Sequence, residues 1–184
     1  MHIVFVTDIF GQHADLDKLI HTWQIPSFSI IDPYQTVRLT FADETQAYQT
    51  FLTRCGHHTY AQLIAEEFQE FTQPCIVIAF SAGASAIWQA LSTINNELIM
   101  HFIGFYPSQI RHHLHLTPNV STQLFFPAHE KHFSVDDVIQ ALSEKPTVQC
   151  IKTKYLHGFL NPLSLNFDQT SWHYFTKKLS KIIN

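Results

Sequence analysis

Short runs of consecutive apolar residues alternate along the chain with longer stretches of helical patterning. The short runs have the length of strands, and several are apolar at neighbouring positions, as strands buried on both faces of a parallel sheet tend to be. We expect six strands, at His2 to Thr7, Ser27 to Ile31, Ile76 to Phe80, Leu98 to Phe105, Gln123 to Phe126 and Val148 to Lys154. The longer stretches predict six helices, at Ala14 to Trp23, Glu44 to Cys55, Tyr60 to Glu70, Ala82 to Ser92, Ser134 to Ser143 and Ser171 to Ile183.

This alternation of strand and helix is typical of βαβ units. It predicts an α/β fold with a mainly parallel sheet and helices on both faces. Because the crossovers between parallel strands are right-handed, ligands are expected at the carboxyl ends of the strands. Every candidate functional residue discussed below directly follows a strand.

Composition narrows the class of protein. The 184 residues are 46% hydrophobic and 14% charged, which favours one folded domain over residues 1–184. The formal charge of −4 offers no basic stripe for nucleic acid. Cys55, Cys75 and Cys150 lack paired C-x-x-C spacing, so we expect reduced thiols rather than a disulfide framework or a zinc site.

The same sequence gives no sign of a membrane partner. The first ten residues contain His2 and Asp8 and lack a cationic leader, so they read as a strand rather than a signal peptide. No apolar stretch approaches the length needed to span a bilayer. We therefore expect a cytoplasmic protein, of an oligomeric state that the sequence does not indicate.

The segment Cys75 to Ile87 predicts a nucleophile elbow. It reads as a buried strand, one polar residue (Ser81) and a helix that starts with small residues, a form of the G-x-S-x-G pattern with Ala79 at the first glycine position. Small residues at Ala79 and Gly83 allow the strand and the helix to meet at a sharp angle around the serine. The alternative is that Ser81 only caps the helix, which is the usual role of a serine at such a junction.

A nucleophilic serine needs a base and an acid that orients the base. For this fold the expected order is serine, acid, histidine. His157 follows the last strand and precedes the flexible Gly158, which makes it the candidate base. Glu130 follows the preceding strand and is the candidate acid. Asp136 and Asp137 are rivals for that role, although both are better placed to stabilise the start of a helix.

Thirteen histidines raise the question of a metal site. His129 and His132 have the spacing of ligands on a helix, but the stretch reads as a loop, so solvated histidines are favoured there. The same interpretation applies to His57, His58, His112, His113 and His115. We expect no metal and no other cofactor.

Four separated motifs resemble those of the dienelactone hydrolase family of α/β hydrolases. They are Val6 to Gly11, in which an acidic residue precedes Ile-Phe-Gly, the elbow from Ala79 to Gly83, Ile103 to Tyr106, and His157-Gly158-Phe159 with Asn161-Pro162. The resemblance covers most of the chain. It implies Ser81 as nucleophile, His157 as base, and the backbone amides of Ile9 and Ala82 as the oxyanion hole. It also implies that Asp8 lies near Ser81; the alternative is that Asp8 is a solvated carboxylate at the end of a strand or a helix cap.

The sequence departs from that family in several places. Glu130 stands where members carry Asp, and serine replaces the usual cysteine nucleophile, which favours an ordinary serine esterase. The arginines that hold the substrate carboxylate of dienelactone enzymes have no match, and the sheet is expected to be truncated to about six strands. Arg111 follows a strand and has two interpretations, an anion-binding group near the site or the partner of a nearby carboxylate.

Two functions follow from these residues. The first is a serine hydrolase that cleaves a small ester, lactone or thioester through an acyl-enzyme, with Ser81, His157 and Glu130 as triad and with Phe10, Tyr106 and Arg111 as neighbours of the site. The second is a catalytically inactive scaffold that binds a small molecule or a protein partner, because a fold does not by itself imply an activity.

Overall fold

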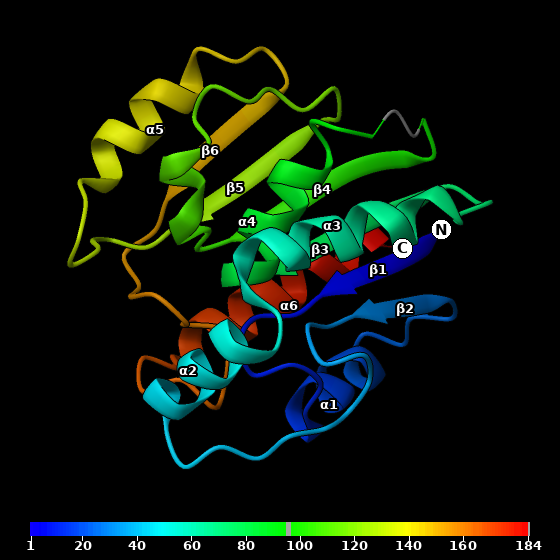
Figure 1. Cartoon of the computed structure of the whole chain (residues 1–184), viewed down its shortest axis with the longest axis vertical. Helices are drawn as coiled ribbons and strands as arrows, with labels where there is room; N and C mark the ends of the chain where they lie inside the picture. The colour runs from blue at the N-terminus through cyan, green and yellow to red at the C-terminus, as the bar shows by residue number, and fades with distance from the viewer. Residues whose placement is uncertain (95–96, 184) are drawn as a thin grey trace.

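A single sheet organises the computed structural model, which describes residues 1–94 and 97–183 (Figure 1). Within these residues the sheet has six strands in the order β2-β1-β3-β4-β5-β6, and every neighbouring pair is parallel. The strands are β1 (His2–Val6), β2 (Phe28–Ile31), β3 (Cys75–Phe80), β4 (Ile99–Phe105), β5 (Thr122–Phe126) and β6 (Val148–Lys152). The expected α/β class and the number of strands are confirmed.

Helices cover both faces of this sheet (Figure 1). They are α1 (Ala14–Thr22), α2 (Glu44–Arg54), α3 (Gly56–Gln69), α4 (Ser81–Ala90), α5 (Val135–Ser143) and α6 (Gln169–Ile183), with a short 3₁₀ helix η1 (Ser108–His112). Alternate residues of β1 show the two layers. Val4 and Val6 belong to the core under α2, α3, α4 and α5, whereas Ile3 and Phe5 belong to the core under α1 and α6.

Two helical segments differ from the sequence-based expectation. Helix α3 begins at Gly56, four residues before Tyr60, because the polar run from Gly56 to Thr59 hides its first turn from the apolar pattern. Gly56 has φ +74°, and this left-handed conformation lets α3 follow α2 directly. Helix η1 was not expected, since five residues after Pro107 carry no helical period.

The order of the strands creates a crevice at one edge of the sheet. From β1 the chain passes to β2 on one side, and β3 then pairs with β1 on the other side. The loops that leave the carboxyl ends of β1 and β3 therefore diverge, which is the usual place for a ligand in an open α/β sheet. Asp8 and Ile9 follow β1 there, and Ser81 follows β3. No helix within residues 1–94 and 97–183 is long and apolar enough to cross a membrane.

Close contact between α4 and β1 makes Gly83 sensitive to substitution. A Cβ atom at Gly83 would overlap the carbonyl oxygen of Thr7 and lie 2.8 Å from that of Val6. Overpacking against backbone typically costs about 1–3 kcal/mol, so we expect Gly83→Ala to lower the melting temperature by roughly 2–12 °C. Gly56→Ala is the matched control, because its added Cβ meets no atom and only the positive φ opposes it. Equal losses in the two variants, measured by thermal unfolding, would contradict this packing argument.

Candidate active site

Ser81 occupies a strained turn between β3 and α4. Its φ is +46°, a left-handed conformation that is uncommon for a residue with a side chain and that tends to occur at functional sites. Ala79 is fully buried two residues earlier, and Gly83 packs against the end of β1 two residues later. As the sequence suggested, small residues on each side allow the sharp junction. The turn leaves Ser81 half-buried at the carboxyl edge of the sheet.

Three side chains form one hydrogen-bonded row across the ends of β3, β5 and β6. Ser81 Oγ lies 2.8 Å from His157 Nε2, and His157 Nδ1 lies 2.7 Å from Glu130 Oε1. The side chains of His157 and Glu130 are 24% and 15% exposed, so the pair is partly shielded from water. The loop that carries the histidine is held by Asn166, whose Nδ2 donates to the His157 carbonyl at 2.9 Å.

The other two candidate acids lie elsewhere. Asp136 and Asp137 are in the first turn of α5, where Ser134 caps the helix by accepting a hydrogen bond from the Asp137 amide. Asp136 forms an exposed ion pair with Lys152 at 2.7 Å. Of the three carboxylates considered from the sequence, Glu130 is the one hydrogen-bonded to His157.

A tight turn after β1 fixes the Ile9 amide that the resemblance implies for an oxyanion hole. Gly11 N donates to the Asp8 carbonyl at 3.1 Å, and the Tyr34 hydroxyl donates to the Ile9 carbonyl at 2.6 Å. These bonds hold the turn without using the Ile9 N–H. Ala82 lies at the amino end of α4, where backbone N–H groups lack intrahelical acceptors. Ile9 and Ala82 both line the same cleft as Ser81.

Asp8 shares that cleft with Ser81, but its carboxylate serves another purpose. Oδ1 accepts a hydrogen bond from Phe10 N at 2.9 Å, and Oδ2 accepts one from Asn161 Nδ2 at 2.6 Å. Asp8 therefore joins the turn that contains Ile9 to the loop that contains His157. Burial raises the pKa of the Asp8 carboxyl, opposed by the hydrogen bond from Asn161 and by the charge of His13.

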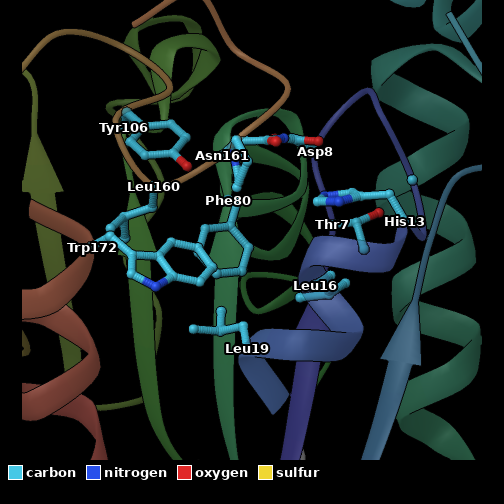
Figure 2. Close-up of a pocket in the computed structure, with 12 residues that line it drawn as sticks. Thr7, Asp8, His13, Leu16, Leu19, Phe80, Tyr106, Leu160, Asn161 and Trp172 are labelled. Carbon is cyan, nitrogen blue, oxygen red and sulfur yellow. The ribbon is translucent and has the colours of Figure 1, made fainter. Parts of the chain in front are cut away.

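Figure 2 shows a small pocket behind this pair, with Asp8, Asn161 and Tyr106 above Phe80, Trp172 and Leu19. It offers only about 20 Å³ for the centres of water molecules. A pocket of this size holds one water or so and not an organic substrate. The larger cleft over Ser81 is therefore the candidate active site.

That cleft has a volume of about 740 Å³, within the usual range for a small-molecule site. All three members of the Ser81 row line it, together with Phe10, Tyr106 and Arg111, which the sequence analysis placed near the site. The Tyr106 ring packs on the His157 ring with centroids 5.0 Å apart. Phe105 and Phe159 do not line the cleft and belong to the core under α1 and α6.

Arg111 does not pair with a carboxylate among the described residues. Its Nη1 donates to the Ser108 carbonyl at 2.6 Å, and the guanidinium lies 5.0 Å from the centre of the Phe133 ring. The interpretation of Arg111 as the partner of a nearby carboxylate is therefore wrong for this structure.

Histidines do not gather into a metal centre in the part of the chain that the structure describes. No group of three or more His, Cys, Asp or Glu side chains there is arranged to hold a metal ion. His129 and His132 lie in an exposed loop, as the sequence indicated.

Sequence reasoning missed three residues at this site. Asn161 was noted only as part of a motif, yet it binds Asp8. Glu44 and His57 line the cleft from α2 and α3, which were not considered as sources of site residues. Both helices reach the cleft by tertiary packing, for which the local sequence gives no signal. Partial burial raises the pKa of the Glu44 carboxyl.

Comparison with known proteins supports the fold. No protein-family model matches the chain. An uncharacterized protein of Bacillus subtilis, YczH, is 28% identical, over 99% of this chain and 90% of its own length. Among solved structures, mouse α/β hydrolase domain-containing protein 10 has a TM-score of 0.67 at 10% identity, over 99% of this chain and 89% of that one.

Two further solved structures cover 99% of this chain. A dienelactone hydrolase-like promiscuous phosphotriesterase from metagenomic libraries has a TM-score of 0.66 at 13% identity, over 84% of its own length. The esterase Est1E of Butyrivibrio proteoclasticus has a TM-score of 0.57 at 7% identity, over 86% of its length. The chain therefore has the α/β-hydrolase fold, and dienelactone hydrolase-like proteins are among its structural neighbours, as the sequence motifs suggested.

Proposed function

We propose that this protein is a serine hydrolase that cleaves a small carboxylic ester, lactone or thioester through an acyl-enzyme. The observation that carries the proposal is the hydrogen-bonded row of Ser81, His157 and Glu130 at the mouth of a substrate-sized cleft. The hydrolases and esterases among the structural neighbours support the same class of reaction. The proposal includes one α/β-hydrolase domain over residues 1–184, a small-molecule substrate and a cytoplasmic location.

Acylation begins when Ser81 Oγ attacks the carbonyl carbon of the substrate. His157 Nε2 accepts the hydroxyl proton, and Glu130 accepts a hydrogen bond from His157 Nδ1–H, which keeps the imidazole in the required tautomer. The carbonyl oxygen becomes an oxyanion that accepts hydrogen bonds from the amides of Ile9 and Ala82. As the tetrahedral intermediate collapses, His157 gives its proton to the departing oxygen or sulfur, so that an ester releases an alcohol, a thioester releases a thiol, and a lactone opens to a hydroxyl that stays on the acyl group.

Deacylation uses the same groups, with a water molecule as the attacking nucleophile and Ser81 as the leaving group. His157 Nε2 accepts a proton from a water molecule, whose oxygen attacks the acyl carbon attached to Ser81. The second oxyanion collapses, the Ser81 oxygen regains its proton from His157, and the carboxylic acid leaves. Because the loops after β1, β3, β5 and β6 carry these groups, each step depends on their relative placement.

The proposal is tested by rapid mixing with a chromogenic ester. A fast release of one equivalent of alcohol, followed by slower turnover and by an acylated Ser81 peptide in the quenched sample, is the expected result. Hydrolysis without an acylated Ser81 would contradict the acyl-enzyme. A folded protein that hydrolyses no ester, lactone or thioester would instead favour the inactive scaffold.

The bond between Asp8 and Asn161 leads to a prediction about stability. Asn161→Ala removes a buried hydrogen bond to a carboxylate, which typically costs about 1.5–3 kcal/mol, so we expect the melting temperature at pH 7 to fall by roughly 3–12 °C. Loss of the Asn161 donor also raises the pKa of Asp8 further above its usual range.

The pH dependence of this loss has a definite sign. A carboxyl whose pKa is raised in the folded state destabilises the fold increasingly as pH rises above its unfolded pKa. The difference between wild type and Asn161→Ala should therefore grow from acidic to neutral pH. Asn166→Ala is the matched control, since its amide binds a neutral carbonyl. A deficit for Asn161→Ala that is constant with pH in thermal unfolding would argue against a charged Asp8.

A further inference from the structure

Three basic side chains line the catalytic cleft without a role in the proposed chemistry: Arg111, His57 and the exposed His132. Arg111 comes from η1, and His57 comes from the first turn of α3. The cleft contains no other Arg or Lys among the described residues that line it. The surroundings of Arg111 and His57 indicate a binding site for a group of the substrate.

Arg111 is held in a fixed position next to α4. The amide of Gln109 donates to Ser85 Oγ at 3.1 Å, and Trp88 Nε1 donates to the His113 carbonyl at 3.0 Å. Ser85 and Trp88 are buried on α4, so both ends of η1 are tied to the helix that starts at Ser81.

The guanidinium itself is only partly used. One N–H donates to the Ser108 carbonyl, and the Phe133 ring lies against the group. Since a guanidinium carries five N–H donors and Arg111 makes no ion pair within the described residues, donors remain for a ligand.

His57 adds a second polar group to the lining of the same cleft. Its ring packs edge-on against Phe51, with centroids 5.0 Å apart, and Nε2 is buried without a hydrogen-bond partner among the described residues. Burial lowers the pKa of His57, and the nearby Arg111, His112 and His113 lower it further. All the charged neighbours that shift the pKa of His57 are therefore basic, and none of them is an acidic residue that could neutralise it.

The acidic residues of the cleft are mostly engaged elsewhere. Glu130 binds His157, Asp8 binds Phe10 N and Asn161, and Asp43 caps α2 by accepting a hydrogen bond from the Gln46 amide at 2.8 Å. Glu44, the remaining one, interacts electrostatically with His157 and Asp8 rather than with His57.

We propose that Arg111 and His57 form a subsite for an anionic group, a carboxylate or a phosphate, on the substrate. Carboxylate and phosphate oxygens match the fork of a guanidinium and accept a further hydrogen bond from an imidazole N–H. This inference rests on the proposed function and narrows it: the substrate is an ester, lactone or thioester that also carries a negative charge.

Matched esters test the subsite during turnover. The substrates are 4-nitrophenyl hexanoate, the 4-nitrophenyl monoester of hexanedioic acid and 4-nitrophenyl 6-phosphonohexanoate, each corrected for its spontaneous hydrolysis. We expect kcat/KM to be higher for one or both anionic esters than for the neutral one. The ratio to compare is kcat/KM for an anionic ester divided by kcat/KM for the neutral ester. Arg111→Gln should lower this ratio by about 10- to 100-fold, and His57→Gln by a smaller factor, because charge-assisted hydrogen bonds are lost.

The matched control for charge is Arg38→Gln. Arg38 forms an exposed ion pair with Asp17 at 2.6 Å and does not line the cleft, so the ratio should stay as in wild type. The ester with the larger ratio identifies the anion as carboxylate or phosphate. A ratio of one in wild type, or a ratio that Arg111→Gln leaves unchanged, overturns the subsite.

A binding experiment separates this inference from the proposed function. Hexanedioate, 6-phosphonohexanoate and the neutral hexanamide are titrated calorimetrically into Ser81→Ala, with and without Arg111→Gln. Tighter binding of an anionic probe than of hexanamide, lost with Arg111→Gln, supports the subsite even if no ester is hydrolysed. Equal binding of all three probes, or no binding, contradicts it even if hydrolysis occurs.

Discussion

Replacing Ser81 by alanine is expected to lower kcat for ester hydrolysis by roughly 10⁴- to 10⁶-fold, because the attacking oxygen is lost. His157→Ala should cause a loss of similar size, since the Ser81 hydroxyl is a weak nucleophile without a base at 2.8 Å. The effects of the two substitutions should not add. Once either partner is missing, removal of the other changes little. Steady-state kinetics of the two single variants and the double variant measure this.

Ser143→Ala is a suitable control for this series, because Ser143 is exposed on α5, does not line the cleft, and donates its hydroxyl to the Ile139 carbonyl at 2.7 Å. Its turnover should equal that of wild type. Thermal unfolding of every variant checks that the fold is retained. If Ser81→Ala keeps more than about 1% of wild-type kcat, a triad of this type is not responsible for the activity.

Glu130→Gln is expected to lower kcat by roughly 10³- to 10⁴-fold while leaving the cleft intact. Glutamine has nearly the shape of glutamate, but its NH₂ group can donate to His157 Nδ1 and thereby favour the wrong tautomer of the imidazole. The loss should appear in kcat and kcat/KM together, because the interaction strengthens as His157 gains a proton.

Asp136→Asn and Asp137→Asn provide matched controls for the acid. Both replace a carboxylate in the first turn of α5 by its amide, and neither is the carboxylate that binds His157 Nδ1, which is Glu130. We expect wild-type turnover from both variants, with at most a small loss of stability from the weaker interaction with the helix dipole. A large loss of kcat in either variant, with Glu130→Gln nearly unaffected, would reverse the assignment.

Local sequence was sufficient to predict the strands and most helices. Apolar runs such as Cys75 to Phe80 are buried on both faces, so they can be recognised as strands without knowing which helices pack on them. The start of α3 and the 3₁₀ helix η1 escaped prediction because both are polar segments whose conformation is fixed by neighbours. For η1, those neighbours are Ser85 and Trp88 on α4.

The residues of the candidate site also fall into two groups, those that the sequence could predict and those that it could not. Ser81, His157 and Glu130 could be selected from the sequence, because each follows a strand and parallel strands bring their carboxyl ends to one edge. The hydrogen-bonding role of Asn161 and the presence of His57 and Glu44 in the cleft could not. These depend on how α2, α3 and the loop after His157 fold over that edge, at sequence separations that reach 153 residues for Asp8 and Asn161.

The most direct test of the central claim is to treat the purified protein with a fluorophosphonate and locate the label by peptide mass spectrometry. Wild type, Ser81→Ala, His157→Ala and the Ser143→Ala control are compared at equal concentration. An activated serine predicts one label on Ser81, absent from Ser81→Ala, greatly slowed in His157→Ala and unchanged in Ser143→Ala. A folded wild-type protein that stays unlabelled, or a label on Ser81 that forms equally fast without His157, would contradict a Ser81–His157 nucleophile.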